Sequence, residues 1–152
     1  MNSLEKELSL LIRARYPVIY LSTLEEDRGS KTLENIAGAE GREFRKWSCT
    51  TGLTGSGGPT TDILTALGQI SKEVTRPAIF LLHDIHPYLD NPMVIRKLRD
   101  LADILRTSQC TLFLVSPAPL VKVPEELADE IWVMDYPLPT LSDLSELLNR
   151  TT

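Results

Sequence analysis

Residues 17–35 read PVIYLSTLEEDRGSKTLEN, and this stretch decides between two kinds of α/β protein. Its short continuous apolar run, residues 18–21, is typical of a strand buried on both faces of a parallel sheet. Gly29, Lys31 and Thr32 follow closely, as residues of these types do in a phosphate-binding loop. The question is whether the segment after this strand can hold a phosphate group.

The residues between the strand and the lysine argue against a working phosphate loop. Such a loop reads GxxxxGK followed by Ser or Thr, so that backbone N–H groups curl around the phosphates and the lysine reaches them. Here acidic residues occupy positions 25–27, and a serine separates Gly29 from Lys31. We instead predict a helix capped by Ser22 or Thr23, because an acidic first turn suits the positive end of a helix dipole.

Four further apolar runs resemble the first, and they occupy residues 44–49, 78–82, 111–115 and 131–134. Between them lie segments with helical spacing of apolar residues, and another such segment opens the chain before Pro17. We expect Thr61 or Asp62 to cap one of these helices. Asn91 caps another, with Pro92 at its first helical position. Alternating strands and helices predict an α/β fold: a five-stranded, mainly parallel sheet with helices on both faces.

Composition narrows the class of protein and its partners. The 152 residues, 42% of them hydrophobic, fit a single domain, 1–152, in which residues 135–152 are expected to form a linker or helix toward a following region. A formal net charge of -5 gives no general attraction to polyphosphate backbones, so we do not expect nucleic acid as a ligand. A membrane is not expected either, since no segment reaches the roughly 20 apolar residues that a span needs.

The two cysteines, Cys49 and Cys110, match no metal-binding or redox spacing. Both lie in or beside apolar strand-like runs, so we expect buried, reduced thiols. The start of the chain also lacks the basic and apolar regions of a secretory leader. These features predict a reducing compartment such as the cytosol.

Two strand ends supply further fragments of nucleotide-binding machinery. The run AIFLLHD ends in Asp84, like the strand that holds Mg²⁺ in ATPases, but the second adjacent acid that such a site needs is absent. The run TLFLVS ends in Ser116, where such enzymes place a residue that senses the γ-phosphate. Both are also ordinary turn residues. An alternative reading, in which ATP and Mg²⁺ bind, uses these two residues together with Lys31 and Thr32.

His83 and His86 stand at HxxH spacing, with Asp84 and Asp90 nearby, and this raises the hypothesis of a metal site. The spacing alone does not make the two rings converge, because they follow a strand end and precede Pro87. We therefore expect polar turn histidines and no metal.

Four long segments are distinctive when taken together, and they read LIRARYPVIYLSTLEEDR, AIFLLHDIHPYLDNPMVIRKLRDLADILRTS, TLFLVSP and IWVMDYPLPTLSDLSELL. They resemble the amino-terminal region of a family of AAA-type ATPases encoded in cyanobacteria and algal plastids. The resemblance implies a degenerate AAA module with a P-loop NTPase core, lacking the helical lid and lying before an intact AAA domain. It places residues 23–28 at the lost phosphate loop, Asp84 at the acidic strand end and Ser116 at the sensor position. It also implies the cyanobacterial cytosol or the plastid stroma.

The segment TTGLTGSGGPTT, residues 50–61, has the composition of a mobile loop. It follows the second strand, where substrate-threading AAA proteins carry an aromatic pore loop. Leu53 is its only large apolar residue, and it contains no lysine. We expect a disordered connection that neither grips a polypeptide nor cradles a nucleotide.

The favoured function is a non-catalytic AAA-like module for the assembly, regulation or partner recruitment of an AAA-type ATPase. Packing residues are kept while site residues are lost, and stability resides in the core while catalysis resides in loops. On this reading the chain itself is not an enzyme, although its full-length relatives look like AAA-type ATPases. Its partner would be another protein, an AAA ATPase domain or a second copy in a homo-oligomer. The expected contact surface is the helix 92–106 and the turn before it, with Arg96, Arg99, Arg106 and Tyr88.

Two other functions stay open at this point. One is an ATP-binding ATPase with a non-standard loop around Lys31 and with Asp84. The other is a receiver-like signalling domain, which would need a cluster of acids at its strand ends. Only Asp84 stands at such an end convincingly, so the receiver-like reading is the least favoured.

Overall fold

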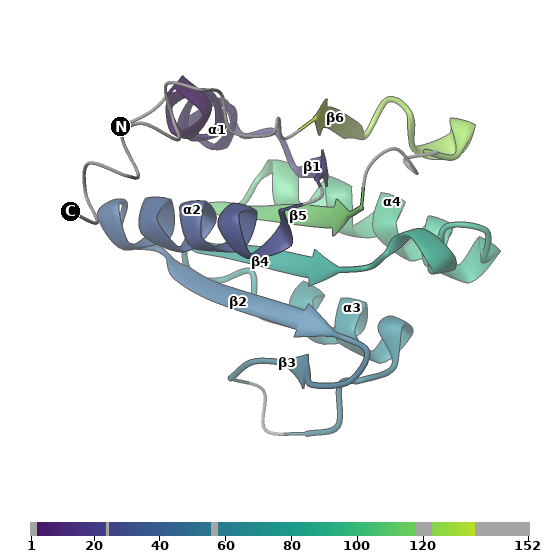
Figure 1. Ribbon diagram of the computed structural model, residues 1–152. Helices are drawn as coiled ribbons and strands as arrows, with labels where there is room; N and C mark the ends of the chain where they lie inside the picture. The colour runs from purple at the N-terminus through teal and green to yellow at the C-terminus, as the bar shows by residue number, and fades with distance from the viewer. Residues whose placement is uncertain (1–2, 24, 56–57, 118–122, 136–152) are drawn as a thin grey trace.

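The continuous apolar runs of the sequence form the parallel strands of one sheet in the computed structural model, which describes residues 3–23, 25–55, 58–117 and 123–135 (Figure 1). The strands are β1 (Val18–Ser22), β2 (Glu43–Ser48), β3 (Gly52–Leu53), β4 (Ala78–His83), β5 (Cys110–Ser116) and β6 (Ile131–Asp135). Their order across the sheet is β3-β2-β4-β5-β1-β6. All neighbours pair in parallel except β2 and β3. The predicted α/β fold is confirmed, but the sheet has six strands and not five.

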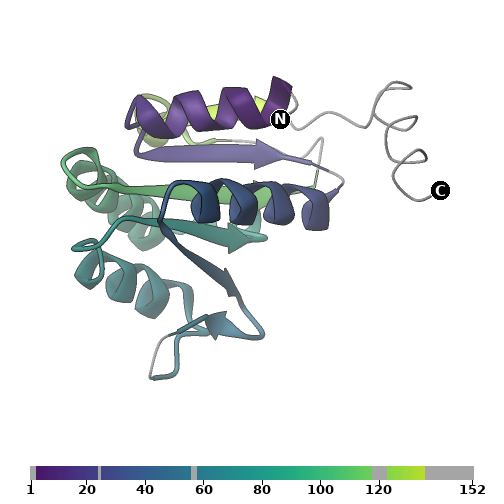
Figure 2. The same cartoon turned by 90° about the vertical axis from the view of Figure 1, so that its left-hand side faces the viewer.

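Helices cover both faces of this sheet. They are α1 (Ser3–Arg13), α2 (Glu26–Ala39), α3 (Ile63–Lys72) and α4 (Pro92–Arg106), with short 3-10 turns η1 (His86–Tyr88) and η2 (Glu125–Leu127). Figures 1 and 2 show α2 on one face and α3 and α4 on the other. Within the described residues, no helix is both long enough and apolar enough to cross a membrane.

The core has two halves because side chains of each strand alternate between the faces of the sheet. On the first face, helices α1 and α2 pack against Ile19, Leu21 and Phe113. On the second face, α3 and α4 pack against Tyr20 and Phe80. Most residues of β1, β4 and β5 are almost fully buried, as strands covered by helices on both faces should be.

Two of the three predicted helix caps are confirmed. The Asp62 carboxylate accepts a hydrogen bond from the backbone N–H of Thr65 at 3.0 Å, and the Asn91 side chain accepts one from Met93 at 2.9 Å. Each side chain satisfies a backbone donor that the first turn of a helix leaves free.

The predicted cap of the second helix is wrong. The helix α2 begins at Glu26, after Glu25, whose side chain makes no capping hydrogen bond. Ser22 still belongs to β1, and the Thr23 hydroxyl accepts a hydrogen bond from the backbone N–H of Glu25 at 2.8 Å. Thr23 therefore closes a small turn between the strand and the helix and does not cap the helix itself.

The expectation of a disordered connection over residues 50–61 is also wrong for the part that the structure describes. Strand β3 lies in this segment and pairs antiparallel with the end of β2. The buried Trp47 indole N–H donates to the Thr60 carbonyl at 2.6 Å, and the Thr60 hydroxyl accepts from the Leu53 N–H at 2.7 Å. Leu53 itself is 4% exposed. A buried indole needs an acceptor, and here the glycine-rich segment supplies it.

Arg45 holds the same segment from the same face of β2 as Trp47, two residues along the strand. Its side chain is buried, with Nε donating to the Thr54 carbonyl at 2.6 Å and Nη1 contacting the Glu73 carboxylate at 2.6 Å. This guanidinium lowers the pKa of Glu73 below its ordinary value. Two buried side chains of β2, Trp47 and Arg45, thus tie the segment to the sheet.

The two cysteines lie in different environments. Cys110 is buried at the start of β5, as predicted, and its thiol donates to the Arg76 carbonyl at 3.0 Å. Burial raises the pKa of the Cys110 thiol. The predicted burial is wrong for Cys49, because this residue follows the last residue of β2 and is exposed.

Candidate functional site

The carboxyl ends of β1, β4 and β5 lie together at one end of the parallel strands, which is where ligands bind in open α/β proteins. The chain leaves β1 toward β2 but leaves β5 in the opposite direction, past β1 to β6. Loops that diverge in this way open a crevice between neighbouring strands. We call this region the switch edge and define it by Thr23, Glu26, His83, Asp84 and Ser116.

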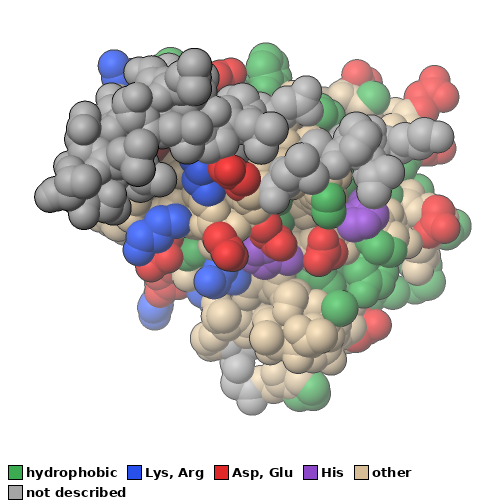
Figure 3. Space-filling view, in the orientation of Figure 1, with side chains coloured by type: hydrophobic (Ala, Val, Ile, Leu, Met, Phe, Trp, Pro, Cys, Tyr) green, Lys and Arg blue, Asp and Glu red, His purple; other side chains and the backbone are tan. Residues whose placement is uncertain are grey.

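A contact between Glu26 and His83 closes the middle of the switch edge. Glu26 opens α2 and His83 ends β4, and the Glu26 Oε1 atom meets the His83 Nδ1 atom. Acidic side chains gather beside the histidines on this face of the molecule (Figure 3). A carboxylate of the chain itself therefore lies at the positive end of the α2 dipole.

A second ion pair within the chain lies at the first turn of α2. The Arg28 Nη1 atom lies 3.2 Å from the Glu25 carboxylate, so this cation is paired close to the helix start. Asp27 adds a further exposed acid to the same turn. An incoming phosphate would meet negative charge at this helix end.

Asp84 acts as the residue at which the chain leaves β4. It is exposed and has a φ of 57°, in the left-handed region that aspartate tolerates better than most residues. Its backbone N–H donates to the Val115 carbonyl at 2.9 Å. This geometry is that of a turn residue held to the neighbouring strand.

Ser116 points into the structure, where its hydroxyl is hydrogen-bonded to the hydroxyl of Tyr20. Ser116 is only 2% exposed, and its carbonyl accepts from the Thr23 N–H at 2.9 Å. Burial raises the pKa of Tyr20, and the negative charge of Asp84 raises it further. The Ser116 hydroxyl therefore ties β5 to β1 inside the core.

Lys31 and Thr32 lie on the second turn of α2 and not in a loop. Lys31 is exposed, whereas Thr32 is buried against the sheet. Asp84 follows the end of β4 and Ser116 ends the neighbouring strand β5, so the two residues lie side by side. Among the described residues, no contact joins Lys31 to either of them. Gly29 and Ser30 are helical as well. The arrangement brings together the two strand-end residues and leaves the lysine on the surface.

The histidine spacing does not produce a metal cluster in the described part of the chain. His83 faces Glu26, and His86 begins the turn η1. No group of three or more His, Cys, Asp or Glu side chains converges among the residues that the structure describes.

Replacing Gly29 by alanine should raise the free energy of unfolding by about 0.5–1 kcal/mol, because alanine favours a helix interior over glycine. A Cβ atom at Gly29 would meet nothing within 4 Å. Chemical denaturation measures the effect. Gly38→Ala, at a second open position of α2, is the matched control and should also be tolerated. A clear loss of stability at Gly29 alone would mean that this residue needs a conformation reserved for glycine.

The predicted docking surface on α4 is exposed, and two of its arginines form ion pairs with acids of the same chain. Arg96 lies 3.0 Å from Asp100 on the same helix. Arg106 contacts Glu130, just before β6, and so helps to hold that end of the helix to the rest of the fold. Arg99 is exposed on the same helix. Tyr88 is half-buried, because its ring packs at 6.1 Å from the ring of Trp47.

Solved structures of similar fold confirm the AAA-like core. A RuvB variant of Thermotoga maritima has a TM-score of 0.61 at 18% identity, over 96% of this chain and 48% of that one. A DNA replication initiation factor has a TM-score of 0.60 at 12% identity, over 97% of this chain and 48% of that one. At such identities the likeness concerns the fold alone.

Closer relatives carry the name "Uncharacterized AAA domain-containing protein ycf46". The protein from Trieres chinensis is 32% identical over 150 residues, and that from Guillardia theta is 33% identical over 154 residues. These matches cover 95% and 97% of this chain but only 30% of each relative. The chain therefore spans less than a third of the length of these relatives.

A family model described as "SpoVK-like AAA ATPase, N-terminal domain" matches residues 4–136. This range takes in β1 to β6 and α2 to α4, as well as the whole switch edge. The chain belongs to the family of SpoVK-like AAA ATPase N-terminal domains.

Proposed function

We propose that this chain is a non-catalytic AAA-like module that serves the assembly, regulation or partner recruitment of an AAA-type ATPase. The contact between Glu26 and His83 carries the proposal. It joins the start of α2 to the end of β4, the two elements between which a P-loop ATPase holds its phosphates and Mg²⁺. In this chain, the side chains of Glu26 and His83 occupy the position between these two elements.

Electrostatics support the same conclusion. The triphosphate of ATP carries several negative charges, and its usual site at a helix start depends on free backbone N–H groups and a nearby lysine. At this helix start the chain offers Glu25, Glu26 and Asp27 instead. Lys31 lies a full turn later with its side chain in solvent. A nucleotide here would meet repulsion without compensating donors.

The helix α4 and its neighbour α3 supply a surface that suits partner recruitment. A cavity of about 430 Å³ opens between them, and its lining includes Leu64, Met93 and Lys97. Met93 is 65% exposed, which is unusual for a large apolar side chain and typical of adaptable protein-binding surfaces. The named relatives are AAA domain-containing proteins much longer than this chain, so an ATPase domain is the partner that we favour.

Adding Mg-ATP to this chain should leave its melting temperature unchanged within about 1 °C. A ligand at a hundred times its dissociation constant would add about 2.7 kcal/mol to the free energy of unfolding, equivalent to several degrees for a domain of this size. Differential scanning fluorimetry with and without Mg-ATP measures the shift.

The matched variant for this experiment is Lys31→Ala, with Lys46→Ala as a control for loss of an exposed positive charge elsewhere. A Mg-ATP-dependent rise that only Lys31→Ala abolishes would contradict the proposal and support the ATP-binding alternative with Lys31, Thr32 and Asp84. A flat response in the parent and both variants is the expected result.

A further inference from the structure

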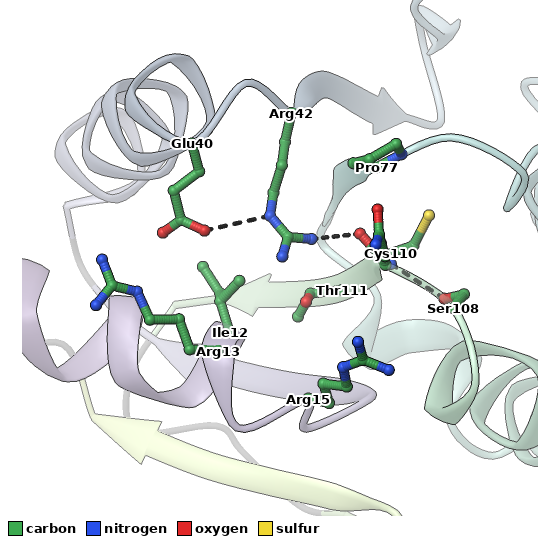
Figure 4. Close-up of a pocket in the computed structure, with 10 residues that line it drawn as sticks. Ile12, Arg13, Arg15, Glu40, Arg42, Pro77, Ser108, Cys110 and Thr111 are labelled. Carbon is green, nitrogen blue, oxygen red and sulfur yellow. Dashed lines mark hydrogen bonds and ion pairs between the residues drawn. The ribbon is translucent and has the colours of Figure 1, made fainter.

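A polar cavity lies at the end of the sheet opposite to the switch edge, between the carboxyl end of α1 and the first residues of β5 (Figure 4). Its volume is about 310 Å³, which suits a small ligand. Its polar lining includes Arg13, Arg15, Glu40, Arg42, Ser108 and Thr111. We call it the arginine cavity.

The charges of the arginine cavity are unbalanced. Among the described residues, its lining holds three arginines and a single acid, Glu40, in a chain whose formal net charge is -5. Glu40 forms an ion pair with Arg42, whose Nε atom lies 3.2 Å from the Glu40 carboxylate. The Arg42 Nη1 atom also donates a hydrogen bond to the Gln109 carbonyl. Arg13 and Arg15 have exposed side chains at the end of α1, and Figure 4 shows them pointing to opposite sides of the cavity, Arg13 to the side of Glu40 and Arg15 to the side of Ser108. In the described part of the lining, the positive charges of Arg13 and Arg15 therefore have no matching acid.

The backbone at Arg15 supplies an independent observation. The N–H of Arg15 donates to the Ile12 carbonyl at 3.1 Å, and the N–H of Tyr16 donates to the Leu11 carbonyl at 3.3 Å. This pair of bonds is the Schellman motif that ends many helices, and its left-handed position is normally a glycine. Arg15 occupies that position with a φ of 62°.

An arginine at this position needs a reason beyond ending the helix. Glycine would end α1 without the steric penalty that a side chain suffers in the left-handed region. A cation near a helix carboxyl end is favourable, but Arg13 already supplies one in the last turn. Backbone strain that persists beside a cavity is a feature of functional sites.

We propose that the arginine cavity binds a small oxyanion carrying phosphate or carboxylate groups, with Arg15 as its main ligand. The planar fork of a guanidinium matches two oxygens of either group, and charge-assisted hydrogen bonds of this kind are the strong ones. The cavity lies at the amino ends of the strands, so the proposal is independent of the switch edge and of the proposed function.

Titration of inorganic pyrophosphate and of citrate into the 152-residue chain, without Mg²⁺, tests this site by isothermal calorimetry. We expect saturable binding of at least one of them. Tighter binding of pyrophosphate would identify a phosphate ligand, and tighter binding of citrate would identify a carboxylate ligand. Arg15→Gly should weaken that binding about tenfold or more and, in the absence of ligand, raise the melting temperature by about 2–4 °C. A variant that gains stability while losing affinity cannot be explained by misfolding.

Arg99→Ala is the matched control, because it removes the same charge from α4 on the other face of the sheet. It should leave the affinity for both oxyanions unchanged. No saturable binding of either oxyanion, or equal weakening by Arg99→Ala and Arg15→Gly, would overturn the proposal. Binding of ATP that Arg15→Gly abolishes and Lys31→Ala retains would support the arginine cavity and leave the proposed function standing.

Discussion

Replacing Trp47 by alanine is expected to lower the free energy of unfolding by about 3–5 kcal/mol, the range found when large aromatic side chains are removed from a core. Trp47 is fully buried, and its ring packs against Tyr88. The change also leaves the Thr60 carbonyl without its donor. Such a loss is a large part of the total stability of a typical domain. Urea denaturation followed by circular dichroism measures it.

Trp47→Phe separates the two contributions, because it keeps an aromatic ring but removes the indole N–H. We expect a loss of about 1–3 kcal/mol, the penalty for leaving a buried carbonyl unsatisfied, together with a small packing change. Faster proteolysis within residues 50–61 should accompany it. If Trp47→Phe left both the stability and the cleavage rate unchanged, the hydrogen bond to Thr60 would not hold this segment in solution.

Replacing Gly52 by alanine is expected to lower the free energy of unfolding by about 2–5 kcal/mol. Gly52 has a φ of +70°, which disfavours any side chain by about 1–2 kcal/mol. A Cβ atom there would also lie 2.7 Å from the Thr60 hydroxyl and 3.3 Å from the Thr60 backbone carbon, so the segment must shift. Overpacking of this kind adds about 1–3 kcal/mol.

Gly41→Ala is the matched control for Gly52→Ala. Gly41 has a similar φ of +67°, but a Cβ atom there would meet nothing within 4 Å. It should therefore show only the backbone contribution, about 1–2 kcal/mol, in the same denaturation experiment. Equal losses at the two positions would show that the close approach of Gly52 to Thr60 is absent in solution.

Strands β1, β4 and β5 could be predicted because they are continuous apolar runs, as burial on both faces requires. Strand β6 is also a continuous apolar run, whereas β2 was recognisable from Phe44 and Trp47 within a mixed segment. Strand β3 could not be predicted, because it has two residues, lies among glycines and is stabilised by Trp47 from the preceding strand. Composition alone favours a mobile loop there. Tertiary contacts, above all the hydrogen bond from Trp47 to Thr60, override that local preference.

The switch edge was predictable only in part. Asp84 and Ser116 were found because each follows an apolar run, and the acids of α2 were visible as a reason to doubt a phosphate loop. The pairing of Glu26 with His83 was not, because 57 residues separate them. In the sequence, Tyr20 is one more residue of an apolar strand run. Alternation along neighbouring strands would have placed it on the same face as Ser116, had the neighbour of β1 been known.

The antiparallel pairing of β3 has a consequence for self-association. Without it, β2 would be a bare edge strand with unpaired backbone groups, which can recruit strands from other chains and seed aggregation. The N–H of Thr54 donates to the Lys46 carbonyl at 2.9 Å, and β3 covers the last two residues of β2. The glycine-rich segment therefore shields the carboxyl end of β2 from other copies of the chain.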